Sequence, residues 1–236
     1  MHRTISLRFQ KERIMNQGKT TFVIIGGTSG IGEAVAQHFT NESNIVHVAS
    51  RSTGLDISDE NSVHHYFESI GPIDHLVITA GSFAPSGKVV DVVTEEAKNA
   101  FDTKFWGSIH AAKNAARYLR PNGSITLTTG MLSRKVVANT YVKSAMNAAL
   151  EIVTKVLAKE LAPIRVNAVS PGLTATTAYQ NMDEENRKSM YDNAKQNLPV
   201  GHIGQASDIA MAYVMVIANP YMTGSIIDVD GGALIN

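Results

Sequence analysis

The chain has 236 residues, enough for one α/β domain of ordinary size with little left for a second. Hydrophobic residues make up 44% and charged residues 18%, a composition typical of a globular protein with a sizeable core. The 21 basic and 21 acidic residues cancel, so the charge favours neither nucleic acid nor an anionic membrane as a partner. The absence of cysteine excludes disulfides and a cysteine nucleophile, and the scattered histidines lack metal-site spacing, so no metal is predicted.

Residues 1–18 differ in character from the rest of the chain. They carry four basic residues, Arg3, Arg8, Lys11 and Arg13. They lack the apolar run of a secretion signal, and no later segment is long enough to span a bilayer. A transit peptide is one interpretation, and a disordered leader with Met15 as an alternative start is another. We expect a disordered leader over 1–18, a single domain over 19–236 and a cytoplasmic protein.

Short apolar runs rich in β-branched residues recur along the chain and predict strands. They cover residues 21–25, 45–49, 75–79, 124–128, 165–169 and 225–229. Segments of helix length lie between most of them, at 31–41, 95–119 and 141–161. Apolar strands that alternate with helices indicate a parallel sheet covered on both faces. Because such crossovers are right-handed, we predict a doubly wound, mostly parallel Rossmann-type sheet.

One connection is too short for this pattern. Only residues 50–55 separate the second predicted strand from the next candidate strand, at 55–58. A parallel crossover needs roughly a dozen residues. We therefore expect the helix between strands 2 and 3 to be missing, and the third strand to be short, displaced or missing.

A glycine-rich turn joins the first strand to the first helix. It reads Gly26-Gly-Thr-Ser-Gly-Ile-Gly32. Gly26 permits a tight turn, Gly30 lets the backbone approach a pyrophosphate, and Gly32 permits close packing of helix on sheet. The free N–H groups and dipole of the helix N-terminus then face the phosphates. A purely structural turn is the alternative interpretation.

This turn resembles the Gly-x-x-x-Gly-x-Gly loop of the short-chain dehydrogenase/reductase family. Further matches follow in order at Asp56-Ile57 and at residues 74–81, 123–125, 160–163, 165–172 and 230–232. The resemblance covers about residues 18–236, almost the whole chain. It implies a cofactor-binding oxidoreductase that acts on a small carbonyl or alcohol.

The residue after the second strand selects the cofactor in this family. An acidic residue there binds the ribose of NAD, whereas this chain has Ser50 and Arg51. A hydroxyl and a guanidinium suit a 2′-phosphate, so NADP(H) is predicted, although Arg51 as a solvated loop cation is the alternative.

The resemblance also assigns the remaining cofactor contacts. They comprise the loop residues Gly26, Thr28, Ser29, Gly30, Ile31 and Gly32, the adenine neighbours Asp56 and Ile57, the ribose–nicotinamide neighbours Ala80 and Gly81, and Pro171, Gly172, Thr174 and Thr176 at the carboxamide end. Two departures, Ile25 for a threonine and Thr79 for an asparagine, are expected to loosen the loop network without abolishing binding.

The catalytic positions depart further from the family. Relatives use a tyrosine with a lysine four residues on, a serine and an asparagine. Gap-free threading puts Gly130 at the serine, Lys143 at the tyrosine, Asn147 at the lysine and Lys104 at the asparagine. The chain thus resembles a divergent branch that lacks the usual tetrad.

Other registers fit less well. A shift that brings Tyr141 into the acid position puts Ala145 at its partner and breaks the downstream match. The one Tyr-x-x-x-Lys, Tyr191 to Lys195, lies in the polar segment 178–199, which we expect to be a mobile cover. We interpret that pair as a solvated helix face, with a donor contributed by the cover as the alternative.

Three functions follow from this sequence. In the first, Lys143 beside Lys104 has a lowered pKa and donates a proton or holds an anionic substrate. In the second, Lys143 points to solvent and the protein is a catalytically inactive cofactor-binding sensor or assembly module. In the third, the protein is purely structural. Helices at 95–119 and 138–161 resemble those that pair in relatives and predict a homodimer or homotetramer.

Overall fold

The structure, a computed structural model, describes residues 18–81 and 83–236. The leader expected over 1–18 lies outside this range except for Gly18, and the single domain over 19–236 stays a prediction. In the described part of the chain, no helix is both long and apolar enough to cross a membrane.

Six parallel strands form the central sheet, in the order β2-β1-β3-β4-β5-β8. They are β1 (Thr20–Ile25), β2 (Asn44–Ala49), β3 (Ile73–Ile78), β4 (Leu119–Thr128), β5 (Arg165–Pro171) and β8 (Ile226–Val229). Each corresponds to one predicted apolar run, although β4 begins earlier than the predicted 124. A separate parallel pair joins β6 (Thr174–Ala175) to β7 (Gly204–Gln205).

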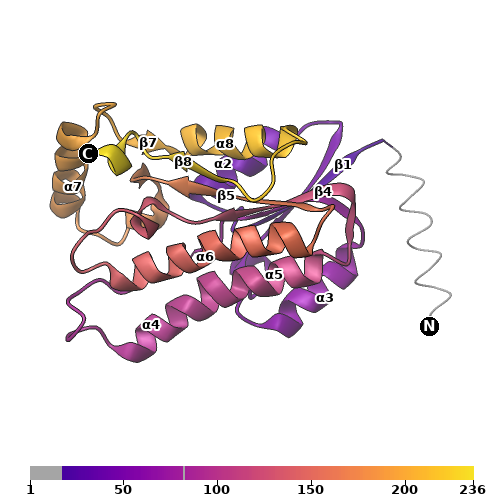
Figure 1. The fold of residues 1–236 in the computed structure, drawn as a ribbon, viewed down its shortest axis with the longest axis horizontal. Coiled ribbons are helices and arrows are strands. Elements are labelled where there is room, and N and C mark those ends of the chain that lie inside the picture. Colours follow the sequence, from indigo (N-terminus) through magenta and orange to yellow (C-terminus); the bar gives the residue numbers. More distant parts are fainter. Residues whose placement is uncertain (1–17, 82) are drawn as a thin grey trace.

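Helices cover both faces of the sheet, which confirms the doubly wound fold (Figure 1). One face carries α2 (Gly30–Phe39) and α8 (Ala206–Ala218), and the other carries α3 (Glu60–Ile70), α5 (Gly107–Ala115) and α6 (Tyr141–Glu160). The helix α7 (Glu184–Asn197) lies at one end of the molecule, near the C-terminus (Figure 1).

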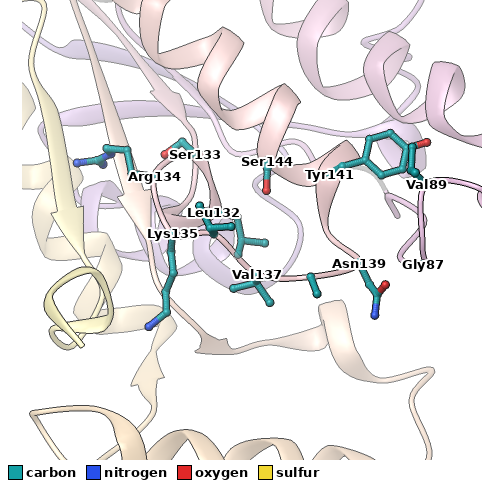
Figure 2. A pocket seen from close by; sticks show the side chains of 12 residues that line it. Gly87, Val89, Leu132, Ser133, Arg134, Lys135, Val137, Asn139, Tyr141 and Ser144 are labelled. Carbon is teal, nitrogen blue, oxygen red and sulfur yellow. The ribbon is translucent and has the colours of Figure 1, made fainter.

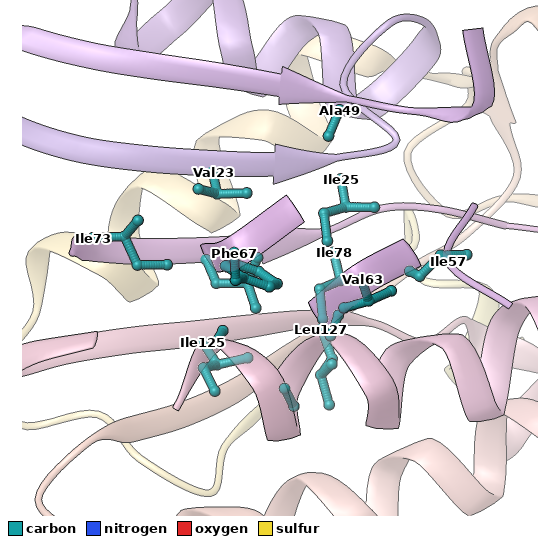
Figure 3. Packing of buried hydrophobic residues seen from close by; sticks show 14 of the residues in the cluster. Val23, Ile25, Ala49, Ile57, Val63, Phe67, Ile73, Ile78, Ile125 and Leu127 are labelled. Carbon is teal, nitrogen blue, oxygen red and sulfur yellow. The ribbon is translucent and has the colours of Figure 1, made fainter. Parts of the chain in front are cut away.

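Alternating side chains of the strands build two cores, one on each face of the sheet. In β1, Val23 and Ile25 pack with Phe67 of α3, whereas Phe22 and Ile24 pack with α2 and α8 on the opposite face. Figure 3 shows the first of these clusters, with Phe67 among the strand residues. The period of two explains why the strands read as continuous apolar runs: both faces are buried.

The short connection after β2 contains no α-helix before residue 55, as predicted; a single 3-10 turn spans Arg51–Thr53. Residues 55–58 form no strand, so of the three expectations for that strand the structure shows the last, a missing one. Leu55 and Ile57 are 2% and 5% exposed, and they line the core from a loop. Their burial explains the strand-like pattern. The chain then crosses through α3 to β3, which pairs with β1 rather than β2.

The helix predicted over 95–119 ends at residue 115 and contains an irregular segment. It consists of α4 (Thr94–Phe101), a π-helical segment at Asp102–Trp106 and α5, and the chain turns before β4 starts at Leu119. A π-turn widens the helix by one residue without interrupting it, so an apolar pattern does not reveal it. Such turns occur often at functional sites, and this one carries Lys104.

Candidate active site

The predicted phosphate loop packs tightly at the carboxyl ends of β1 and β3. Gly26 has φ +87°, and its N–H donates to the carbonyl of Ala49 at 2.7 Å. A Cβ added to Gly26 would lie 2.5 Å from the amide nitrogen of Ala80, and one added to Gly32 would collide with the carbonyl of Gly26. Neither position accepts a side chain, so the loop requires its glycines.

The N-terminus of α2 is free to bind an anion. Ser29 is the N-cap residue but makes no capping hydrogen bond through its side chain, and Thr28 and Ser29 are exposed. The first N–H groups of a helix lack partners within it, and they carry a positive partial charge. Gly30 begins this helix, and the half-buried Ile31 packs into the core beneath it. The loop therefore suits a pyrophosphate.

Thr79 compensates for its departure from the family pattern. Its N–H and its hydroxyl donate to the carbonyl of Ile25 at 2.8 and 3.1 Å, and the N–H of Ala80 donates to the same oxygen at 3.1 Å. These bonds tie the end of β3 to the end of β1. Gly81 follows in the exposed strand–loop junction.

Ser50 and Arg51 lie where the ribose end of a dinucleotide is predicted. Ser50 accepts or donates a 2.8 Å hydrogen bond with Ser52, and its N–H donates to the Thr53 hydroxyl at 2.8 Å. Arg51 is exposed, and within the described residues its guanidinium takes part in no ion pair. Its five donors are thus available to a phosphate.

Asp56 and Ile57 differ in what they can contribute. The Asp56 carboxylate accepts from the hydroxyl and the N–H of Ser58 at 2.7 and 3.0 Å, and these bonds hold its pKa below the usual value. The Ile57 side chain lies in the core beside Val63 (Figure 3), so it supports the wall of the crevice. Asp56 is exposed and faces outward.

The segment after β5 meets the phosphate loop. Gly172 donates through its N–H to Val229 at 2.9 Å, and the hydroxyl of the buried Thr174 donates to the carbonyl of Gly172 at 3.1 Å. A Cβ added to Gly30 would lie 3.3 Å from Cβ of Thr176. The residues predicted at the pyrophosphate end therefore lie next to those predicted at the carboxamide end, which follow Pro171 at the end of β5.

Two lysines lie together at the predicted catalytic positions. The ammonium of Lys104 donates to Asn147 Oδ1 at 2.6 Å and to the carbonyl of Thr129 at 3.2 Å. Burial, and to a smaller extent the charge of Lys143, lowers the pKa of Lys104 to about 8. Lys143 donates to the hydroxyl of Ser86 at 3.0 Å, and burial lowers its pKa as well.

The position of the Asn147 side chain requires that residue 130 be a glycine. A Cβ added to Gly130 would lie 2.9 Å from Nδ2 of Asn147, which itself is 6% exposed. A serine at position 130 would therefore displace the amide that binds Lys104. The departures at positions 104, 130 and 147 form one packed arrangement, and this coupling was not visible in a residue-by-residue threading.

An open pocket of about 420 Å³ lies along the loop after β4 and the start of α6, and its lining includes Gly87, the neighbour of the Ser86 that binds Lys143. Figure 2 shows Tyr141 and Val89 toward one end and Arg134 toward the other. Val137 adds to the apolar lining, and Tyr141 is 41% exposed. The sequence did not point to this loop, because its residues follow no recognisable spacing.

Arg134 anchors the pocket loop to the sheet. Its guanidinium bonds Asp228 on β8 at 2.7 Å and Glu151 on α6 at 3.2 Å. Glu151 also accepts from the hydroxyl of Ser133 at 2.5 Å. Asp228 and Glu151 are therefore both paired with Arg134. No sequence motif predicted these contacts of Arg134.

The other candidate donor pair lies elsewhere. Tyr191 and Lys195 lie on α7, where the ammonium of Lys195 contacts Asp192 at 3.3 Å and the ring of Tyr191 packs edge-on against Tyr179. This agrees with the interpretation as a solvated helix face. Across the described residues, no three His, Cys, Asp or Glu side chains gather closely enough to hold a metal.

Known proteins resemble this chain over most of its length. The family model described as enoyl-(acyl carrier protein) reductase matches residues 44–233. The short-chain dehydrogenase/reductase ATR9 of Stachybotrys chlorohalonatus is 33% identical, over 91% of this chain and 97% of its own. Carbonyl reductase family member 4 of Danio rerio is 31% identical, over 89% and 96%. The chain therefore belongs to the short-chain dehydrogenase/reductase family of oxidoreductases.

Two solved structures are still more similar. A small-chain dehydrogenase in complex with NADPH is 67% identical with a TM-score of 0.92, over 92% of this chain and 100% of its own. A second small-chain dehydrogenase is 65% identical with a TM-score of 0.87, over the same shares. The NADPH in the first relative agrees with the cofactor predicted from Ser50 and Arg51.

Proposed function

We propose that the protein is an NADP(H)-dependent oxidoreductase that acts on a small carbonyl or alcohol and uses a non-standard active site. The related dehydrogenase in complex with NADPH supports this cofactor. So do the free N-terminus of α2 and the unpaired guanidinium of Arg51. When bound, NADP(H) supplies or accepts the hydride.

One observation carries the catalytic part of the proposal: the half-buried Lys104 binds Asn147, and the charge of the nearby Lys143 helps to lower the pKa of Lys104. Lys143 is the proton donor to the substrate oxygen, because it occupies the predicted tyrosine position with a lowered pKa. Burial lowers the pKa of Lys143 and thereby favours release of its proton.

The test is steady-state NADPH consumption with a panel of aldehydes, ketones and oxo acids. We expect slow turnover of some members and weak or undetectable turnover of common ketones. Lys143→Met is expected to abolish turnover while the Kd for NADPH stays within twofold. Turnover that survives in Lys143→Met contradicts the assignment of the donor.

The second candidate is a catalytically inactive cofactor-binding sensor or assembly module. It is favoured by the intact phosphate loop beside positions 130 and 143, which lack the serine and tyrosine of active relatives. This candidate predicts a rise in Tm with NADPH but no consumption with any member of the panel.

A further inference from the structure

The charge of the two lysines is not balanced within the site. In the described part of the chain, neither Lys104 nor Lys143 takes part in an ion pair, and no carboxylate raises the pKa of either. The acidic residues on the neighbouring elements, Glu151 and Asp228, are engaged by Arg134. A buried cation without a counter-ion is costly, and an anionic ligand would remove that cost.

Lys104 retains a free donor. An ammonium has three N–H groups, and Lys104 uses two of them, for Asn147 and for the carbonyl of Thr129. These two bonds hold the ammonium in place, and the third N–H has no acceptor among the described residues. An ordered, charged donor is what a carboxylate requires.

The open pocket along the loop after β4 is mixed, because Arg134 and Lys135 line it together with apolar side chains. Val89, Leu132, Val137 and the ring of Tyr141 line it, as Figure 2 shows. A ligand that fits both parts has an apolar body and an anionic group close to its reacting carbon.

We propose that the substrate is an anionic carbonyl compound, an oxo acid with an apolar body, whose carboxylate is held by Lys104 while Lys143 faces the carbonyl oxygen. This deepens the proposed function and rests on it for the reaction. The carbonyl carbon takes a hydride from NADPH and its oxygen takes a proton from Lys143. The oxo acid becomes a hydroxy acid, NADPH becomes NADP⁺, and water reprotonates Lys143.

Benzoylformate and its methyl ester are a matched pair of probes, because they differ only in the negative charge. We expect the KM for the acid to be at least tenfold lower than for the ester. Lys104→Met should erase this preference and leave the Kd for NADPH within twofold. Lys98→Met, at an exposed lysine of α4 paired with Glu95, is the control and should keep the preference.

Benzoate binding to the native protein loaded with NADP⁺ separates the two proposals without a variant. Benzoate should bind at least tenfold more tightly than benzamide. Benzoate binding without reduction of either probe supports the anion site and rejects turnover. Equal reduction of acid and ester supports turnover and overturns the anion site. Failure of benzoate to bind more tightly than benzamide also overturns it.

Discussion

A single residue, Arg51, is predicted to set the preference for NADPH over NADH. If Arg51 contacts a 2′-phosphate, NADPH should bind at least tenfold more tightly than NADH, which is about 1.4 kcal/mol. Arg51→Ala should remove most of that difference, because the guanidinium makes no ion pair within the described residues. Titration followed by intrinsic fluorescence measures both constants, and Arg117→Ala, at another exposed arginine, is the control. Equal affinities in the native protein reject the assignment.

The lowered pKa of Lys104 links stability to pH. Its pKa is about 8 in the folded protein against an ordinary 10.5, so between these values the unfolded chain binds more protons. Stability contributed at this residue therefore rises with pH. From pH 8 to 9.5 the free energy of unfolding should increase by about 1 to 2 kcal/mol more in the native protein than in Lys104→Met. Urea unfolding at both pH values measures this, and parallel profiles would refute it.

The site was predictable from sequence only in part. The resemblance to the family placed Lys104, Lys143 and Asn147 at the catalytic positions, because the flanking motifs fix the register. It did not reveal that Gly130 is glycine because Asn147 lies 2.9 Å from where a Cβ would be. It also missed Arg134, since a bond to Asp228 on a distant strand leaves no trace in local sequence.

The helix α3, which connects β2 to β3, is held on the sheet by a buried aromatic side chain. Phe67 is fully buried, and its ring stacks on Tyr118 with centroids 6.3 Å apart. Phe67→Ala should lower the free energy of unfolding by about 3 to 5 kcal/mol, the usual cost of such a cavity. Phe83→Ala is the control, because Phe83 is 91% exposed and should change stability by less than about 0.5 kcal/mol. Equal losses in chemical denaturation would show that α3 does not depend on this contact.

The strands were predictable, because buried parallel strands read as apolar runs. The helical patterns predicted α2, α6 and the α4–α5 segment, whereas α3, α7 and α8 were not predicted. The errors have physical causes. Leu55 and Ile57 are buried from a loop, so they imitate a strand. The π-turn at Asp102–Trp106, which contains Lys104, lies within a helix and leaves its apolar pattern intact. Neither feature alters the apolar pattern on which the prediction depended.

At the scale of the whole molecule, large apolar side chains are exposed on the face formed by α5 and α6. Trp106 is 51% exposed beside α5, and Ile152 and Val156 are 59% and 45% exposed one turn apart on α6. We predict a symmetric homodimer or homotetramer built through this face. Ile152→Glu with Val156→Glu should shift the protein to monomer in light scattering, whereas Met211→Glu on α8 should not. A monomeric native protein at micromolar concentration contradicts this.

In the proposed reaction, Lys143 rather than a tyrosine supplies the proton. The most direct measurement is the single-turnover rate of NADPH oxidation with benzoylformate in the native protein, Lys143→Met and Tyr141→Phe. Tyr141 lies two positions earlier on α6 and lines the open pocket. We predict that the rate falls at least a hundredfold in Lys143→Met and less than threefold in Tyr141→Phe, with cofactor affinity unchanged in both. A rate lost in Tyr141→Phe and kept in Lys143→Met would contradict the account.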